Sequence, residues 1–456
     1  MGGSVAGLLA ARVLTDHFDR VTLIERDRLP DDARHRKGVP QGRHVHTLLS
    51  KGWQIIKRYF PDIDAPGEGG ITPVDWPHAL CWFHYGGYKP RMESGIYAVM
   101  ASRPYVEWQI RRRVLGREGL TALQQCRVLD LVASPDRRRI TGVRVQRKSE
   151  EEAVLCADLV VDATGRGSRS PKWLEALGYG RPDEHRIQID FMYTSRIYRR
   201  VPGALGGAKA AYMLPAPPHG GKRAGALCSI ENDTWLVTLG GWLGEPAPQG
   251  EDEFLDFART LPAQDLYHAI KDAEPLTDLA IHKFPSNLRR RYETMKRFPE
   301  GYVVLGDALC SVNPVYGQGM TASALAAATL DRCLTEHRQR GDFSGFPKRF
   351  FRQVAREIDR PWRLAACEDF RYPEVRGAKM PGTDAVNWYM KKVHQAALHD
   401  PAVYKAFIKV MHLLNAPATL FHPRIAFRVL RARIAQRRAG QSRRVQSAVP
   451  LASVSG

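Results

Sequence analysis

The chain opens on MGGSVAGLLAARVL (Met1–Leu14), and this stretch decides how the first half is expected to fold. Its first residues fit the spacing G-x-G-x-x-G, with Ser4 in the place of the middle glycine. Gly2, Gly3 and Gly7 would let the backbone turn tightly and approach a pyrophosphate at the N-terminus of the following helix. The stretch therefore predicts the phosphate-binding turn of a dinucleotide-binding unit.

The next segments follow in the order that such a unit requires. Leu8–Leu14 is compatible with a helix, and the apolar run Val21–Ile24 is typical of a β-strand. The strand ends at Glu25, and an acidic residue about 20 positions after the glycines is where a ribose hydroxyl is bound. Glycines, helix, strand and acid in this order favour a dinucleotide-binding unit over a chance run of glycines.

The β-strand that normally precedes the glycine turn is missing, because only Met1 stands before Gly2. An empty position in the centre of a sheet would leave ladder groups of its neighbours unpaired. We expect that the chain starts at an internal methionine, since everything downstream is intact, and the alternative is a damaged protein. The predicted fold class is α/β, with a Rossmann-like unit whose first strand is missing.

Composition sets wider bounds on the protein. A length of 456 residues predicts two domains, or one domain with a large insertion. The seven cysteines form no CxxC pair, which argues against a zinc site or a disulfide framework and fits a reducing cytoplasm. We therefore expect a cytoplasmic protein without a metal site, a secretory signal or a membrane-spanning segment.

Two later stretches indicate further contacts with the same ligand. Leu159–Ser168 runs from an apolar strand into a turn of small residues. Tyr302–Met320 contains an apolar strand that ends in Gly306-Asp307 and a Pro/Gly loop, followed by the small-residue helix Thr321–Ala328. Amides at a helix start can face an anion, and Asp307 can accept a hydrogen bond from a ribitol or ribose hydroxyl. The alternative role for Asp307 is that of a helix cap.

With these residues the chain resembles the flavoprotein monooxygenases of the p-hydroxybenzoate hydroxylase-like superfamily, nearest the squalene-epoxidase-like and polyether-polyketide epoxidase branch. The resemblance runs from Gly2 to about Phe427. It implies FAD as the cofactor, and an FAD-binding Rossmann-like fold with an inserted antiparallel β-sheet substrate domain and C-terminal helices. The segments that carry it are RKGVPQGRHVHTLL (36–49), SRPYVEWQIRRRVL (102–115), LVVDATGRGS (159–168) and LGDALCSVNPVYGQGM (305–320).

The resemblance also assigns roles to individual residues. The glycine turn and Glu25 would hold the adenosine and pyrophosphate, Arg103 would reach the FAD, and the backbone of Val128 would contact adenine. Asp307 and Met320 bracket the loop that would hold the ribityl and pyrophosphate. The cofactor-binding residues that it implies are Gly2, Gly3, Gly7, Glu25, Arg26, Arg103, Val128, Gly306, Asp307, Gly319 and Met320.

The flavin ring is expected near residues 36–46, where His44 and His46 are the best polar candidates for a catalytic role. The alternative is that these histidines only satisfy backbone groups. The chain has no Ser/His/Asp order and no metal-ligand spacing, as expected when a flavin supplies the chemistry. The turn at Asp162 differs from the Asp-Gly form linked to NADPH use, so the electron source is open between NAD(P)H and reduced flavin from a partner reductase.

Alternation of apolar and polar residues predicts antiparallel strands in RIQIDFMYTSRIYRR (186–200) and TWLVTLGGW (234–242). In the family such a sheet walls the substrate pocket, although it could serve stability alone. The predicted division is an FAD-binding domain at 1–180 and 284–345, a substrate domain at 181–283, a C-terminal helical region at 346–440 and a disordered basic tail at 441–456.

The leading function is an FAD-dependent monooxygenase that epoxidises or hydroxylates a lipophilic terpenoid or polyketide with molecular oxygen. In the family the reactive species is a flavin C4a-hydroperoxide. A reductase or dehydrogenase of the geranylgeranyl-reductase type shares the same flavin motifs. A flavin halogenase is a further alternative, although the chain has no W-x-W-x-I-P stretch. A non-catalytic flavoprotein or apo-protein is the remaining class.

The formal net charge of +20 is unevenly distributed. Residues 401–456 hold ten Lys and Arg and no acid, without the interleaved aromatic residues of a nucleic-acid binder, so we expect no nucleic acid as partner. Residues 406–414 and 425–434 have apolar side chains at helical spacing among basic ones. Such helices either pack on the body of the protein or lie on an anionic membrane, which would make the protein peripheral.

Overall fold

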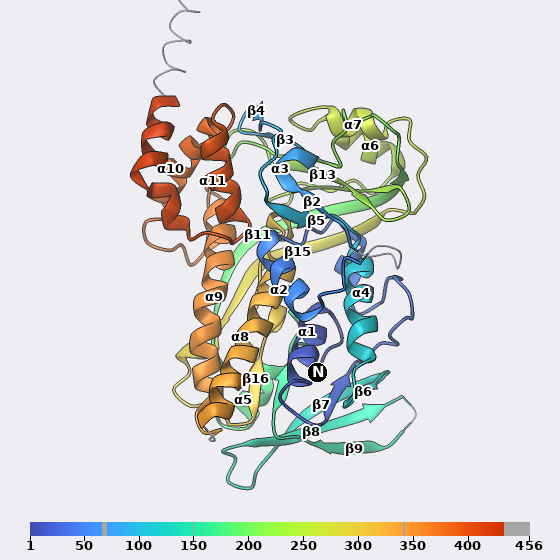
Figure 1. Ribbon diagram of the computed structural model, residues 1–456, viewed down its shortest axis with the longest axis vertical. Coiled ribbons are helices and arrows are strands. Elements are labelled where there is room, and N and C mark those ends of the chain that lie inside the picture. Colours follow the sequence, from blue (N-terminus) through green and yellow to red (C-terminus); the bar gives the residue numbers. More distant parts are fainter. Residues whose placement is uncertain (66–70, 149, 341–342, 433–456) are drawn as a thin grey trace, which may run out of the picture.

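The computed structural model describes residues 1–65, 71–148, 150–340 and 343–432. It has the mixed α/β architecture that the sequence predicts, with a large sheet in the upper half of Figure 1 and the N-terminal unit below it. The predicted basic tail at 441–456 lies outside the described residues, as does the end of the predicted helical region after position 432. Among the described residues, no helix is long and apolar enough to cross a membrane.

The N-terminal unit consists of helix α1 (Val5–Leu14) and two pairs of short parallel strands. β1 (Val21–Ile24) pairs with β6 (Leu120–Leu123), and β10 (Val160–Asp162) pairs with β16 (Tyr302–Val304). All four strands are rich in Val, Leu and Ile, as strands buried on both faces are. The glycine turn thus enters its helix beside parallel strands, as the dinucleotide-binding motif requires.

The two strand pairs are connected through Met1 and Gly2. The amide of Gly2 donates to the Ile24 carbonyl at 2.8 Å, on the side of β1. On the side of β10, the terminal amine of Met1 donates to the Val161 carbonyl and the Ala163 amide donates to the Met1 carbonyl, both at 2.9 Å. Among the described residues, no β-strand lies between β1 and β10. The position between these two strands is the one that the predicted missing strand would occupy.

The largest sheet has nine strands and carries the cavity described below. Its strands β11 (Asp183–Arg199) and β14 (Thr234–Gly241) cover all but the last residue of the segments 186–200 and 234–242 predicted from alternation. The sheet draws on more of the chain than residues 181–283. Its order is β17 (Cys310–Ser311), β15 (Ala280–Arg291), β11 (Asp183–Arg199), β14 (Thr234–Gly241), β13 (Arg223–Ile230), β12 (Ala210–Met213), β3 (Leu80–His84) and β4 (Gly87–Tyr88), with β18 (Arg376–Gly377) beside β11.

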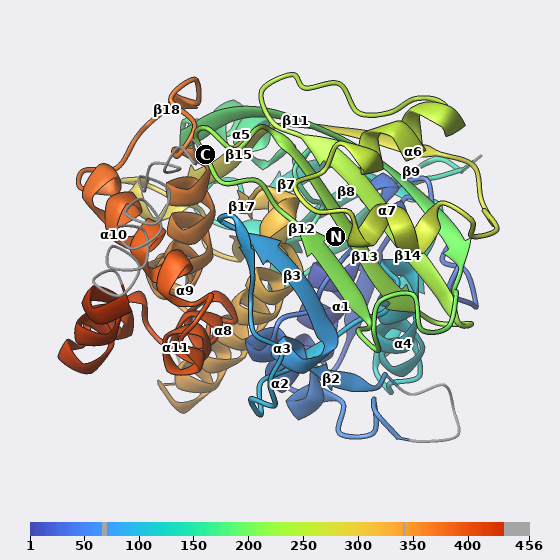
Figure 2. The same ribbon diagram turned by 90° about the horizontal axis from the view of Figure 1, so that it is seen from above.

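Strand alternation gives this sheet two different faces. One face is covered by helices α6 (Glu251–Arg259) and α7 (Asp265–Ile270), as the view from above shows (Figure 2). Val237 and Leu239 pack against these helices in one apolar cluster. Thr238, which lies between them in β14, therefore points to the opposite face, and that face looks into the cavity.

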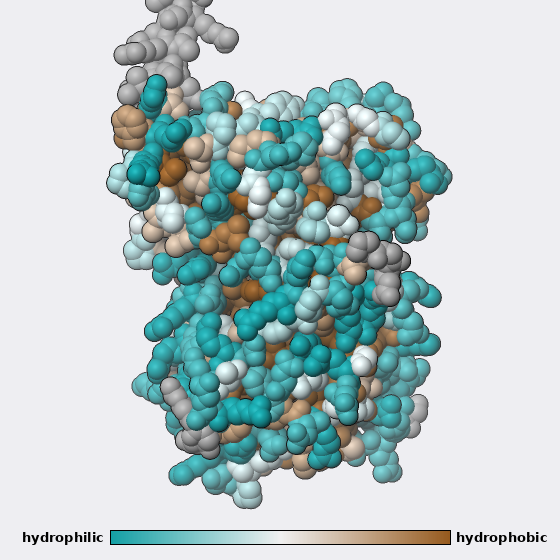
Figure 3. Space-filling view, in the orientation of Figure 1, coloured by the Kyte–Doolittle hydropathy of each residue, from teal (hydrophilic) through white to brown (hydrophobic). Residues whose placement is uncertain are grey.

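Long helices complete the fold. α8 (Gly319–Arg340) packs on α1 and on α9 (Phe346–Asp369), whose apolar residues recur at helical spacing. α10 (Thr383–Ala396), α11 (Pro401–Met411) and a helical stretch at 423–432 then lie beside one end of the large sheet (Figure 1). Hydrophilic side chains dominate the surface in Figure 3, and hydrophobic ones lie among them over these C-terminal helices.

The remaining elements are short or peripheral. α2 (Ser50–Tyr59) packs on α8, and α4 (Arg103–Leu115) packs on α1. The other elements are the antiparallel strands β7 (Cys126–Ala133), β8 (Ile140–Arg147) and β9 (Glu152–Cys156), the pair β2 (Pro73–Asp75) and β5 (Tyr97–Val99), the helices α3 (Trp76–Ala79) and α5 (Ser170–Ala176), and the 3-10 turns η1 (Pro40–Arg43), η2 (Tyr292–Thr294), η3 (Gly306–Ala308), η4 (Pro314–Tyr316) and η5 (Pro417–Phe421).

Candidate functional site

One cavity of about 840 Å³ runs from the glycine turn, past the inner face of the large sheet, to the C-terminal helices. This volume lies near the upper end of the range for ligand cavities, roughly 300–1,000 Å³. The cavity brings together eleven of the thirteen residues singled out in the sequence, which are Gly2, Gly3, Glu25, Arg26, His44, His46, Arg103, Val128, Asp307, Gly319 and Met320.

The other two residues, Gly7 and Gly306, lie behind the cavity wall and act through close packing. A Cβ on Gly7 would stand 1.7 Å from the carbonyl oxygen of Gly2, so only glycine lets α1 start against its own turn. Gly306 has φ +64°, and a Cβ there would stand 2.6 Å from the Cβ of Ala6. The two glycines therefore bring the first turn, α1 and η3 close together.

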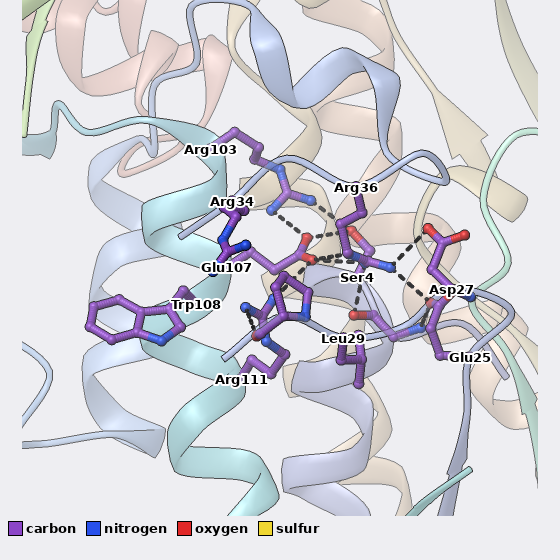
Figure 4. Close-up of polar contacts among 12 residues, drawn as sticks. Ser4, Glu25, Asp27, Leu29, Arg34, Arg36, Arg103, Glu107, Trp108 and Arg111 are labelled. Atoms are coloured by element: carbon purple, nitrogen blue, oxygen red, sulfur yellow. Dashed lines mark hydrogen bonds and ion pairs between the residues drawn. The ribbon is translucent and has the colours of Figure 1, made fainter. Parts of the chain in front are cut away.

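Ser4 at the start of α1 belongs to a buried polar cluster (Figure 4). Its hydroxyl donates to Glu107 at 2.8 Å and accepts from Arg103 at 2.9 Å, and it caps no backbone amide of α1. Glu107 lies on α4 and is 3% exposed, with Arg103 one turn before it and Arg111 one turn after it. The first amides of α1 are thus left without a side-chain cap.

Arg36 extends this cluster to the glycine turn. Its guanidinium lies 2.7 Å from Glu107 and 3.3 Å from Glu25, and it donates to the carbonyl of Gly3 at 3.0 Å. Glu25 in turn accepts from the amide of Gly3 at 2.6 Å. Burial alone would raise the pKa of Glu107, but Arg103 and Arg36 outweigh burial and hold that pKa below its ordinary value.

The sequence analysis missed the role of Glu107, although a signal for it was present. An acid flanked by arginines at i−4 and i+4 on one helix puts three charges on the same face. Such a face can lie in solvent or can pair with another buried charge. The sequence alone does not distinguish a solvent-exposed face from a buried one. Arg36, the first residue of the segment expected near a flavin ring, lies against Glu25 and the glycine turn and lines the cavity.

Asp307 lies on the cavity wall across from the cluster. Among the described residues its carboxylate makes no hydrogen bond, although Arg103 and Arg166 lie near enough to act on its charge. Burial raises the pKa of Asp307, and the two arginines oppose this shift. Asp307 is therefore a hydrogen-bond acceptor that faces the cavity and is not used by the protein itself, which disfavours the helix-cap alternative.

The loop after Asp307 is held by a buried carboxylate from α9. Asp369 accepts from the side chains of Asn313 at 2.8 Å, Tyr316 at 2.8 Å, Asn287 at 2.6 Å and Trp242 at 3.2 Å. Burial raises the pKa of Asp369 to about 6, although all four donors act to lower it. The α9 helix thus fixes one wall of the cavity, a contact that no sequence pattern indicated.

His44 and His46 lie in the middle of the cavity, where the chain leaves η1. Burial is the largest cause that lowers the pKa of His44 to about 2 and that of His46 to about 4, so both rings are neutral near pH 7. The Nδ1 atom of His46 lies 2.9 Å from the His44 carbonyl, as the backbone-satisfying alternative predicts. The sheet adds Tyr193 and His282, whose rings lie 4.5 and 5.6 Å from that of His44.

The far end of the cavity is aromatic and apolar. Residues from α3, the sheet and the loop after β12, α9, α10 and α11 converge there although they are far apart in the sequence, so no short sequence pattern marks them. They are Trp76, Trp82, His84, Tyr212, Leu214, Leu364, Glu368, Met390, His394, Phe407, Val410 and Met411. No cluster of His, Cys, Asp and Glu suited to a metal ion occurs in the described ranges.

Solved structures share this fold at low sequence identity. A flavoprotein/dehydrogenase from Cytophaga hutchinsonii has a TM-score of 0.67 at 13% identity, covering 95% of this chain and 97% of that one. The flavin-dependent brominase Bmp2 has a TM-score of 0.63 at 13% identity, covering 96% and 98%. PqsL of Pseudomonas aeruginosa, a probable FAD-dependent monooxygenase, has a TM-score of 0.59 at 14% identity, covering 81% and 95%. The predicted fold class is confirmed.

One curated protein gives a much higher sequence identity. It is Protein Rv3254 of Mycobacterium tuberculosis (strain ATCC 25618 / H37Rv), which is 32% identical over 438 residues, covering 91% of this chain and 89% of that protein. No model of a protein family matches the chain. Identity at this level over nearly the full length of both chains establishes common descent, and the chain belongs to the family of Rv3254.

Proposed function

We propose that the chain is an FAD-dependent monooxygenase, with FAD bound along the cavity. The observation that carries the proposal is that the glycine turn, the start of α1 and the unpaired Asp307 all open onto one cavity. The structural likeness to flavin-dependent enzymes supports the same cofactor. The adenosine would lie by Glu25 and Val128, the pyrophosphate by the start of α1, and the ribityl chain by Asp307.

The polar end of the cavity suits an anion in two ways. The first amides of α1 have no side-chain cap, and uncapped helix starts bind phosphate oxygens. At this end the cavity is also lined by more arginines than acidic residues, and the acidic residues are Glu25 and Asp307. The arginines are Arg26, Arg36, Arg103, Arg127, Arg166 and Arg169. Both features would attract a pyrophosphate, and Asp307 would then bind hydroxyl groups rather than phosphate.

When bound, the flavin would supply the redox chemistry, and the chain would orient the substrate and exclude water. The aromatic end of the cavity is the part that would take a lipophilic molecule, of the terpenoid or polyketide class. Epoxidation and hydroxylation are the two outcomes we propose for it. NAD(P)H and a partner flavin reductase are the candidate electron donors.

The experiment for this function uses the purified chain, a reductant and panels of terpenoid and polyketide substrates under ¹⁸O₂. The expected result is a product heavier by one labelled oxygen atom, detected by mass spectrometry. A labelled product with intact flavin supports the monooxygenase. A product that gains or loses two hydrogens without oxygen would indicate the reductase alternative and contradict the proposal.

A flavin halogenase is the second candidate, because the brominase Bmp2 and the halogenase CmlS share the fold. The W-x-W-x-I-P stretch is absent from the sequence, which favours the monooxygenase. Adding bromide or chloride to the same reactions separates the two. A product whose isotope pattern shows bromine or chlorine would replace the monooxygenase by the halogenase.

A further inference from the structure

His44 lies in an unusual setting for a histidine at a candidate active site. It is 3% exposed, and its ring packs at 4.5 Å from Tyr193 with no carboxylate of the described residues paired to it. A charged imidazole would be costly there, so the ring is neutral and only one of its two nitrogens carries a proton. Which nitrogen it is decides what His44 offers to a ligand.

The neighbours of Nδ1 answer that question. Ser195 Oγ lies 2.7 Å from His44 Nδ1, and Thr238 Oγ1 lies 2.6 Å from Ser195 Oγ. Thr238 Oγ1 also accepts from the amide of Val45 at 2.9 Å. If Thr238 donates to Ser195 and Ser195 donates to His44 Nδ1, every proton in this chain of hydrogen bonds has an acceptor supplied by the protein. Each direction leaves one proton for a ligand in the cavity, that of His44 Nε2 in the first direction and that of Thr238 in the reverse one.

In the first direction the other ring nitrogen, Nε2, carries the proton. His44 Nε2 makes no hydrogen bond within the described residues. It is also not fully enclosed by protein atoms, so a ligand can reach it. Since His44 lines the cavity, its Nε2–H opens onto it. The surrounding wall is aromatic, with Phe191, Tyr193 and Phe284 from neighbouring strands. A neutral N–H in such a wall suits a neutral acceptor oxygen on a ring compound.

We propose that Ser195 and Thr238 are positioning residues that fix His44 as the Nε2–H tautomer, and that this N–H selects lipophilic molecules with a neutral carbonyl or hydroxyl oxygen. The inference rests on the proposed function only in taking such molecules as the substrate class. The hydrogen bond in question is donated by His44 of the chain itself, so the inference can be tested by binding measurements that need no catalytic reaction.

The first test observes the tautomer directly. Long-range ¹H–¹⁵N NMR spectra of the full chain with ¹⁵N-labelled histidine distinguish protonated from unprotonated ring nitrogens, and His44→Gln assigns the signals. We expect an unprotonated Nδ1 and a protonated Nε2 in the wild type. Ser195→Ala and Thr238→Val should both shift the ring toward a mixture of tautomers. A protonated Nδ1 in the wild type, or spectra unchanged in both variants, would overturn the proposal.

The second test measures selection with two rings of the same size, 9-fluorenone and fluorene. Fluorenone adds one carbonyl acceptor, and a neutral hydrogen bond of about 1 kcal/mol corresponds to roughly fivefold tighter binding. The wild type should show this preference and a lowered carbonyl stretching frequency of bound fluorenone. His44→Phe, which has no N–H donor, should lose both, while the exposed His399→Phe serves as the matched control. Equal binding of the two rings by the wild type, or a preference that survives in His44→Phe, contradicts the proposal.

Flavin content measured on the same samples separates the two proposals. A chain with full flavin and no fluorenone preference contradicts the selection by His44 and leaves the cofactor in place. A chain that binds fluorenone as expected but takes up no flavin contradicts the proposed function, and leaves the tautomer and its selectivity standing.

Discussion

The two ends of the cavity satisfy their polar groups in different ways. At the glycine turn, Glu107 is paired with Arg36 and Arg103, and Glu25 with Arg36 and the Gly3 amide. At the aromatic end, enclosed nitrogens of four lining residues make no hydrogen bond within the described residues, and these are Trp76, Trp82, His84 and His394. An enclosed polar atom without a partner costs about 1–3 kcal/mol.

This difference indicates what each end contributes. The glycine end is a network whose charges depend on one another, so it is fixed before any ligand arrives. The aromatic end carries polar atoms that the fold itself does not satisfy, which lowers its contribution to stability. We expect substitutions within the network of Glu25, Arg36, Arg103 and Glu107 to unfold the chain readily, and conservative ones at the aromatic end to be tolerated.

The largest effect is expected from Glu107→Ala. The substitution would leave Arg36, Arg103 and Arg111 buried without their shared counter-charge, and breaking a buried pair in this way costs about 3–5 kcal/mol. Urea unfolding of the purified variant measures the loss. The exposed Glu118→Ala, just beyond the same helix, should change the free energy of unfolding by less than about 0.5 kcal/mol. Equal stability of the two variants would mean that the network does not hold the glycine end.

The next effect concerns pH and Asp369, which holds the loop between the two ends. Its folded-state pKa is raised to about 6, so the ionised carboxylate is disfavoured by folding. Its contribution to stability is therefore full below the ordinary pKa of an aspartate and is lost as the pH rises through about 6. A rise of about two units corresponds to roughly 3 kcal/mol.

Urea unfolding between pH 4 and pH 8 tests this contribution in the wild type and in Asp369→Asn. The difference in free energy of unfolding between them should favour the wild type most at the acid end and shrink toward pH 7. A difference that stays constant across this range would show that Asp369 keeps an ordinary pKa in the folded chain.

A smaller and opposite effect is expected at the aromatic end. His394→Phe replaces a buried imidazole by an apolar ring of similar size. Neither nitrogen of the imidazole makes a hydrogen bond within the described residues, although Nε2 lies 4.0 Å from Glu368. Since an unsatisfied group is removed, the free energy of unfolding should stay the same or rise by up to about 1 kcal/mol. Thermal unfolding of His394→Phe and Glu107→Ala, measured in parallel, compares the stability contributions of the aromatic end and the glycine end. A loss of more than about 2 kcal/mol in His394→Phe would remove the contrast between them.

The glycine end of the cavity could be predicted from the sequence to a much larger extent than the aromatic end. The glycine end is encoded in short runs, because a turn, a helix and a strand fix the places of Gly2, Gly3 and Glu25 within 25 residues. Asp307 could be predicted for the same reason, since it lies three residues after β16, a strand of that unit. The aromatic end joins residues such as Trp82 and Phe407, more than 300 positions apart, and Glu107 acquires its role only through Arg36 on another segment.

The smallest effect is expected at the outer side of the helices that close the aromatic end. Trp388 and Phe427 are 60% and 66% exposed there, and the exposed Arg424 and Arg431 lie within four positions of Phe427 in the chain. We propose that this surface associates with anionic membranes, where each basic residue contributes about 1 kcal/mol at low salt. Co-sedimentation with anionic and neutral vesicles, at low and high salt, measures the association.

We expect binding to anionic vesicles at low salt only, and Arg424→Glu should weaken it. Arg138→Glu is the control, because Arg138 is exposed in the turn between β7 and β8, at the other end of the molecule (Figure 1). Wild-type protein that stays in solution with anionic vesicles at low salt would contradict the association.

We propose above that the cavity binds FAD through its polar end, with Asp307 as an acceptor for its hydroxyl groups. The most direct measurement is the dissociation constant of FAD for the folded chain and for Asp307→Ala, by flavin fluorescence or calorimetry. Asp307 makes no hydrogen bond within the described residues, so the variant should keep its stability while FAD binding weakens about 10- to 100-fold. Exposed Asp278→Ala should bind FAD as the wild type does. A folded wild-type chain that binds no FAD, or an Asp307→Ala variant with unchanged affinity, would contradict the account.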